Sequence, residues 1–174
     1  MKPASTVALS LAGVVLSWIW PVGGSGQSKT DRNFMIKAAQ SNIAEIQAGQ
    51  LAAIQGSTDL VKRFGTMMVN DHTMALNELD SIVRREIRDS LPKEPDAEHK
   101  LLAQQLQNMK GKEFDEAYIQ SQVKDHQTAI ALFETEVSQG EHPALKAYAT
   151  KTLPRLRMHL DHVRSLAGAA KQAQ

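Results

Sequence analysis

The sequence predicts an all-α protein: a ferritin-like four-helix bundle with a short extra helix in the long connection between its second and third helices. Three observations predict this fold class. Apolar residues recur at helical spacing over four long stretches, and no stretch alternates long enough to indicate a strand. Aromatic residues make up only 5%, while Ala, Leu, Gln and Met are common, which suits long helices. Glycines and prolines fall between the four stretches and separate them.

Residues 1–26 are expected to be a cleavable signal peptide. A short basic start precedes an apolar run over residues 7–20, and Pro21 and several small residues follow it. The run is shorter than the about 20 residues that span a bilayer. An uncleaved anchor is the alternative, because the small-residue site lacks the usual alanines. We therefore expect an exported, periplasmic protein, with outer-membrane association left open. Residues 27–174 would form a single bundle domain without a transmembrane span.

The first two helices are predicted on either side of a tight turn. The first covers residues 31–55, with an apolar stripe that includes Ile54. Residues 56–59 break the pattern, and their polar side chains can cap the next helix. The second helix should end near Ser90, because Pro92 cannot continue it.

The second half contains a short helix and two long ones. The short helix is expected over residues 97–109, the third long helix over 113–138, and the fourth from Pro143 onward. The connection between the second and third long helices has about twenty residues, enough to cross the roughly 40 Å length of a bundle. That length permits these two helices to run parallel, as in ferritin-like topology. A simple up-and-down bundle stays open.

Charge and cysteine content exclude several classes of protein. Lys2 is the one charged residue among residues 1–26, so the rest carries 19 basic and 19 acidic side chains. This neutrality argues against nucleic-acid binding, which needs a basic surface. The absence of cysteine excludes disulfides, thiolate metal sites and a cysteine nucleophile.

Two segments 54 residues apart repeat the pattern V-x-D-H-x-x-A-apolar, at residues 69–76 and 123–130. Each segment places its histidine on the apolar stripe of a predicted long helix. The match suggests that two helix pairs arose by duplication.

All four long helices place one ionisable side chain on the apolar face: Glu45, His72, His126 and His159. Counted from the helix ends at 1.5 Å per residue, these side chains fall at similar heights. Three imidazoles and a carboxylate suit a divalent transition metal such as iron or zinc. The alternative is a hydrogen-bonded polar layer that fixes helix register, with Glu45 as the shared acceptor.

Neighbouring residues narrow the chemistry. No Glu-x-x-His pair occurs, which argues against a di-iron carboxylate centre. Met67, Met68 and Met74 lie near the first histidine, and Met-His combinations bind Cu(I), but their helical spacing favours ordinary core filling. Asp71 and Asp125 point away from their histidines and are expected to accept from Arg or Lys of a neighbouring helix.

Residues 31–166 resemble an exported bacterial family catalogued as a domain of unknown function and often labelled an outer membrane protein. The resemblance rests on four runs, AAQSNIAEIQAGQLAA, VKRFGTMMVNDHTMALNEL, FDEAYIQSQVKDHQTAIALFE and ALKAYATKTLPRLRMHL. It implies a ferritin-like bundle in the cell envelope and supports Glu45, His72, His126 and His159 as the site. It implies no established activity.

The sequence therefore predicts an exported four-helix bundle with a buried His/Glu layer and leaves its biochemical role open. A bound divalent transition metal is one hypothesis. A second is a metal-dependent oxidoreductase that handles peroxide or dioxygen, so whether the protein is an enzyme stays open. A third is an envelope interaction module without metal. A homo-oligomer and an envelope protein partner are both compatible with the sequence.

Overall fold

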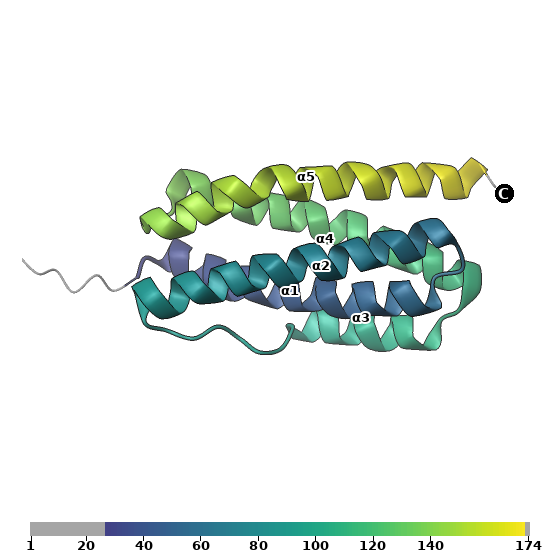
Figure 1. The fold of residues 1–174 in the computed structure, drawn as a ribbon, viewed down its shortest axis with the longest axis horizontal. Helices are drawn as coiled ribbons and strands as arrows, with labels where there is room; N and C mark the ends of the chain where they lie inside the picture. Colours follow the sequence, from purple (N-terminus) through teal and green to yellow (C-terminus); the bar gives the residue numbers. More distant parts are fainter. Residues whose placement is uncertain (1–26, 173–174) are drawn as a thin grey trace, which may run out of the picture.

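The computed structural model describes residues 27–172, which form the helices drawn in Figure 1. The predicted signal peptide lies outside the described residues. The helices are α1 (Lys29–Gln55), α2 (Asp59–Ile82), the π-helical turn η1 (Val83–Ile87), α3 (Ala97–Asn108), α4 (Gly111–Gln139) and α5 (Pro143–Gln172). None of the helices described is long and apolar enough to cross a membrane.

The four long helices form the predicted bundle with ferritin-like topology. Helix α1 packs against α2 and α4, and α5 packs against α4 and α2, so α2 and α4 lie on one diagonal. Figure 1 shows α2 and α4 running in one direction and α1 and α5 in the other. The connection through α3 returns the chain to the end where α2 began, which makes the diagonal helices parallel. The up-and-down alternative is therefore wrong.

Local side chains explain most helix boundaries. Ser28 accepts from the Asp31 amide, Thr58 from the Val61 amide and Asp96 from the His99 amide, so each caps the start of a helix. The second helix ends earlier than predicted. It widens into the π-helical turn η1 and stops at Arg88, which adopts a left-handed conformation with φ of 59°.

The core divides into two apolar halves with polar residues between them. One half gathers around Phe34, Phe133 and Tyr148, and the other around Phe64 and Tyr118. Fully burying one such side chain contributes roughly 1.5–3 kcal/mol. The two halves thus hold the middle of the bundle, where the inward histidines lie, in a fixed geometry.

The first helix buries its small residues instead of its isoleucines. Ala38, Ala48, Gly49 and Ala52 are buried, whereas Ile54, predicted on the apolar stripe, is 77% exposed. The reason is close packing of α1 on α2: a Cβ placed on Gly49 would lie 2.8 Å from the carbonyl oxygen of Gly65. Bulky β-branched residues cannot occupy such a contact, so they turn outward.

We expect Gly65→Ala to destabilise the protein although alanine favours helix. A Cβ there would lie 2.7 Å from both the Gly49 carbonyl oxygen and the Ala52 Cβ, and such overpacking costs about 1–3 kcal/mol. Gly168→Ala is the matched control, because no atom lies within 4 Å of its added Cβ. It should be neutral or stabilising by up to about 1 kcal/mol. Urea unfolding of both variants measures the difference, and equal stabilities would contradict the close contact.

Candidate metal centre

Three of the four predicted site residues converge in the middle of the bundle. His72 on α2, His126 on α4 and His159 on α5 are 5%, 1% and 1% exposed. Their ring centroids are 5.3–5.7 Å apart. One nitrogen from each ring can be chosen so that all three atoms lie within 4.8 Å of one another. The predicted common height is therefore confirmed for the histidines.

The repeated segments explain how two of these rings meet. His72 and His126 occupy equivalent positions in the two repeats, and these lie on the parallel diagonal helices α2 and α4. Equivalent positions on parallel helices share a height, so the rings face each other across the bundle axis. The repeat thus relates two single helices across the diagonal, and the helix hairpins α1–α2 and α4–α5 are not its units.

Contacts at the outer nitrogens determine the tautomers of two rings. Nδ1 of His126 lies 2.9 Å from the carbonyl oxygen of Gln122, which can only accept, so Nδ1 donates. Nε2 of His159 lies 2.8 Å from a carboxylate oxygen of Asp71 and donates to it. Nε2 of His126 and Nδ1 of His159 therefore carry lone pairs. These two nitrogens face each other at 3.3 Å.

The tautomer of the third ring, His72, also follows from the acceptor at its outer nitrogen. Nδ1 of His72 lies 2.8 Å from Oδ1 of Asn42, whose amide nitrogen donates to the carbonyl oxygen of Ala38. The Asn42 oxygen is thus the acceptor and Nδ1 of His72 the donor. Nε2 of His72 keeps its lone pair and is buried without a hydrogen-bond partner among the described residues.

Three lone pairs consequently point at one another in the bundle interior. Burial lowers the pKa of each ring. The pKa of His72 lies well below its usual value, because the neighbouring His126 and His159 add to the effect of burial. The pKa of His126 is also lowered, and that of His159 falls to about 4. The rings are therefore neutral near pH 7, the form that binds metals. An ion with bonds of about 2.0 Å needs nitrogens roughly 3.5 Å apart in a trigonal arrangement, which small ring movements would provide.

Glu45 lies beside this cluster but not in it. Its carboxylate is 3.8 Å from Nδ1 of His126, the nitrogen that faces away from the other two rings. It accepts from Nε2 of Gln122 at 2.5 Å, so it is not the shared acceptor for the histidines. Burial, aided by the charge of Asp125, raises the pKa of Glu45 to about 8.

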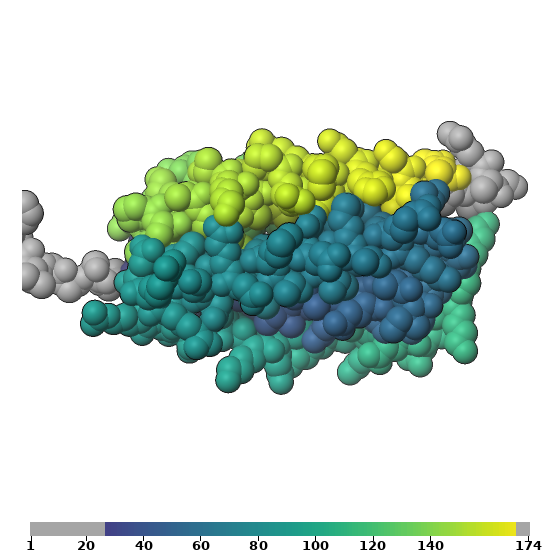
Figure 2. Space-filling view, in the orientation of Figure 1, coloured from purple at the N-terminus to yellow at the C-terminus, as the bar shows by residue number. Residues whose placement is uncertain are grey.

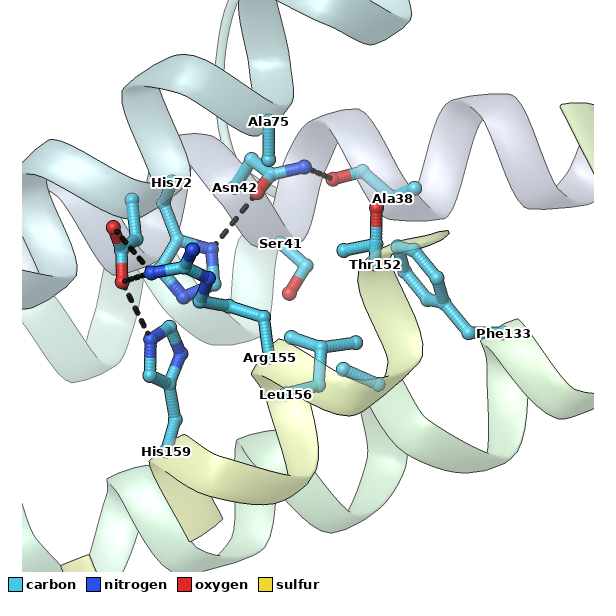
Figure 3. Close-up of a pocket in the computed structure, with 12 residues that line it drawn as sticks. Ala38, Ser41, Asn42, His72, Ala75, Phe133, Thr152, Arg155, Leu156 and His159 are labelled. Carbon is cyan, nitrogen blue, oxygen red and sulfur yellow. Dashed lines mark hydrogen bonds and ion pairs between the residues drawn. The ribbon is translucent and has the colours of Figure 1, made fainter. Parts of the chain in front are cut away.

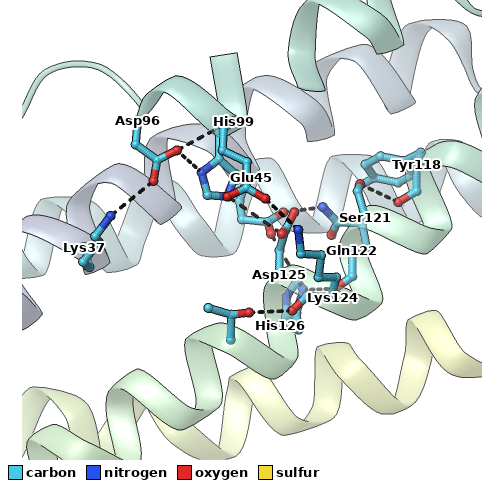
Figure 4. A network of polar contacts seen from close by, with 12 residues as sticks. Lys37, Glu45, Asp96, His99, Tyr118, Ser121, Gln122, Lys124, Asp125 and His126 are labelled. Atoms are coloured by element: carbon cyan, nitrogen blue, oxygen red, sulfur yellow. Dashed lines mark hydrogen bonds and ion pairs between the residues drawn. The ribbon is translucent and has the colours of Figure 1, made fainter. Parts of the chain in front are cut away.

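Helix α3 closes the Glu45 side of the bundle. Its His99 contacts Asp96 at 2.7 Å and Asp125 at 3.8 Å, and Asp96 pairs with Lys37 (Figure 4). These contacts leave His99 half-buried. Asp125 meets this histidine rather than the Arg or Lys that was predicted.

Asp71 stands at the opposite edge of the cluster. Nη1 of Arg155 on α5 lies 3.1 and 3.3 Å from its two carboxylate oxygens, as the sequence predicted for this aspartate. The same carboxylate orients His159. A cavity of about 20 Å³ adjoins both residues together with His72 and Asn42 (Figure 3).

Sequence reasoning missed Asn42 and Gln122, the residues that hold His72 and His126 from outside the cluster. Both leave a signal. Asn42 lies three residues before Glu45 and Gln122 four before His126, so each shares a helix face with a predicted site residue. Both are buried polar residues on an otherwise apolar face.

Comparisons with known proteins agree with the fold. The family described as "Domain of unknown function (DUF4142)" matches residues 22–166. No curated protein sequence matches the chain. Among solved structures, a protein described as "CopM in the Cu(I)-bound form" matches with a TM-score of 0.67 and 14% identity. The match covers 82% of this chain and 98% of that one, and at this identity it shows a shared fold.

Proposed function

This chain belongs to the family described as a domain of unknown function (DUF4142), and we propose that it binds one transition-metal ion at His72, His126 and His159. The observation that carries the proposal is the convergence of three buried lone pairs, one of them on a nitrogen without a hydrogen-bond partner. Leaving such a nitrogen unpaired costs about 1–3 kcal/mol, which a bound ion would recover.

The outer hydrogen bonds support ligation. In metal sites, the second ring nitrogen of a histidine donates to a carboxylate or carbonyl, which fixes the tautomer and orients the ring. Each ring has such an acceptor here: Asn42 for His72, the Gln122 carbonyl for His126 and Asp71 for His159. A layer that only fixed register would join the inner nitrogens by hydrogen bonds. Nε2 of His126 and Nδ1 of His159 lie 3.3 Å apart, but both rings carry their proton on the outer nitrogen, so neither inner nitrogen can donate.

The charge around the three rings favours Cu(I) over the divalent ions that the sequence suggested. The rings are neutral, Glu45 has a pKa of about 8, and the charge of Asp71 is offset by Arg155. A buried monovalent ion therefore needs less compensation than iron or zinc would. Imidazole suits copper, and the protein that shares this fold was solved with Cu(I) bound. We place Glu45 outside the ligand set, as a neighbour of His126.

Anaerobic titration of the purified protein with Cu(I) against a competing chelator tests the proposal. We expect one ion per chain. Extended X-ray absorption fine structure should show three nitrogen neighbours of the copper at about 2.0 Å and no sulfur. His126→Ala should abolish binding. His162→Ala is the control, because that exposed histidine lies one turn beyond His159. Substoichiometric binding of Cu(I), zinc and iron alike would refute a metal site.

We further propose that the protein is exported, from the basic start and apolar run of residues 1–26. The mass and the cell fraction of the expressed protein test the export. Protein released by osmotic shock should have the mass of a chain cleaved near residue 26, and a full-length mass in the membrane fraction would indicate an anchor.

A further inference from the structure

The cavity of about 20 Å³ between α2 and α5 adjoins the histidine cluster from one side. It is large enough for one water-sized particle and is lined by Asn42, Asp71, His72 and His159 among others. Arg155 is the one exposed side chain among the described residues that line it, with 55% of its side chain in contact with solvent. Figure 3 shows its guanidinium reaching from α5 past the rings of His72 and His159.

On the opposite side, a smaller cavity of about 10 Å³ adjoins Glu45 and Gln122, but none of the three cluster histidines lines it. There the His126 ring presents Nδ1, which is committed to the Gln122 carbonyl, while its lone pair faces inward. Glu45 and Gln122 lie behind this ring, and His99, Leu102 and Ala103 of α3 line the same small cavity. An ion arriving from this side would have to pass the ring itself. On the α2–α5 side, by contrast, the rings of His72 and His159 themselves line the cavity.

We propose that this seam between α2 and α5 is the route by which the ion reaches the histidines, and that Arg155 is its removable cover. The inference rests on the proposed function. The positive guanidinium stands over the mouth of the cavity, where it blocks an arriving cation by volume and by charge. Figure 2 shows the face on which α5 meets α2 along this seam.

The attachment of the cover suits reversible opening. Among the described residues its polar partner is the carboxylate of Asp71, and an ion pair whose arginine lies at the surface contributes only about 0–1 kcal/mol. Asp71 also accepts from His159 at 2.8 Å, so its carboxylate stays in place when the arginine swings out. The cover can therefore open without disturbing the orientation of a ligand.

Arg155→Ala tests the cover, and Lys151→Ala is its matched control. Lys151 lies four residues earlier on α5, is 70% exposed and pairs with Glu78 of α2 at 2.9 Å, but it does not line the cavity. In the ion-free protein, diethyl pyrocarbonate modifies accessible neutral imidazoles, and mass spectrometry measures the rate at each histidine. We expect faster modification of His72 or His159 in Arg155→Ala, relative to the exposed His162, and no such increase in Lys151→Ala.

The second readout is the rate at which Cu(I) passes from the protein to a chelator. Removing the charge and volume of Arg155 should accelerate release by about tenfold or more, with Lys151→Ala at the wild-type rate. Unchanged modification and release in Arg155→Ala, or equal acceleration in both variants, would overturn the proposed route. If no copper binds, the proposed function fails while the modification rates still decide whether Arg155 covers the cluster.

Discussion

Replacing His72 by leucine and Asn42 by valine together is expected to raise the stability of the ion-free protein while abolishing its stabilisation by Cu(I). The double variant removes a buried nitrogen that lacks a hydrogen-bond partner, and it removes the donor and acceptor of the His72–Asn42 bond at the same time. An unsatisfied buried nitrogen costs about 1–3 kcal/mol, and replacing both members of a hydrogen bond by apolar groups is nearly neutral. The ion-free variant should therefore unfold at higher urea concentration.

The wild-type protein, by contrast, should become more stable when Cu(I) is present. An ion present at a thousand times its Kd stabilises the folded state by about 4 kcal/mol, which raises the Tm by on the order of 10 °C for a chain of this size. Calorimetry with and without Cu(I) measures both effects. His162→Leu, at an exposed histidine of the same helix as His159, should keep the full response to copper.

Two outcomes would contradict this account. An equal shift in Tm for the double variant would show that copper binds elsewhere. A large loss of stability in the ion-free double variant would show that the polar layer holds the bundle together, which is the register-fixing alternative. A binding site predicts that the ion-free double variant is more stable than the wild type, whereas a structural layer predicts that it is less stable. Binding sites are commonly kept at a cost in stability.

Much of this arrangement could be predicted from the sequence because helical spacing determines which face a residue occupies. The inward positions of His72, His126 and His159 follow from their apolar neighbours, and the shared height of two of them follows from the repeat. The long connection through α3 permitted the parallel diagonal, and the structure confirms it.

The details of the site could not be predicted, because they depend on how the helices are rotated against one another. Spacing places Glu45 on an inward face, but it cannot say which nitrogen of His126 the carboxylate meets. It likewise cannot show that Asp71, beside His72 in sequence, orients His159 of another helix. The close packing at Gly49 and Gly65 sets the rotation of α1, and it turned Ile54 outward against the prediction.

The stability of the ion-free protein should fall as the pH rises from 7 to 8, against the usual pattern for a protein with paired carboxylates. Burial raises the pKa of both Glu45 and Glu136 to about 8, aided at Glu45 by the charge of Asp125 and at the fully buried Glu136 by the neighbouring Asp31. In the unfolded chain these groups have lost their protons above about pH 5. The folded state therefore holds protons that the unfolded state lacks, and this stabilisation is lost as the pH rises through the folded pKa.

The histidines change the stability with pH in the opposite direction, which is why the test is confined to pH 7 to 8. Their pKa values are lowered by folding, so their contribution is complete above about pH 7 and is lost only in acid. Between pH 7 and 8 the buried glutamates therefore determine how the unfolding free energy changes with pH. It falls by about 1.4 kcal/mol per pH unit for each proton that the folded state retains. Urea unfolding at several pH values with a chelator present measures it.

Glu136→Gln should reduce this slope to the share of Glu45, and Glu45→Gln combined with Glu136→Gln should flatten it. Glutamine keeps the shape of a protonated carboxyl group but cannot ionise, so its burial costs the same at every pH. Glu134→Gln is the matched control on the same helix, because Glu134 is exposed and pairs with Arg157 at the surface. A wild-type protein whose unfolding free energy is constant from pH 7 to 8 would show that these two carboxyl groups do not retain their protons in the folded bundle.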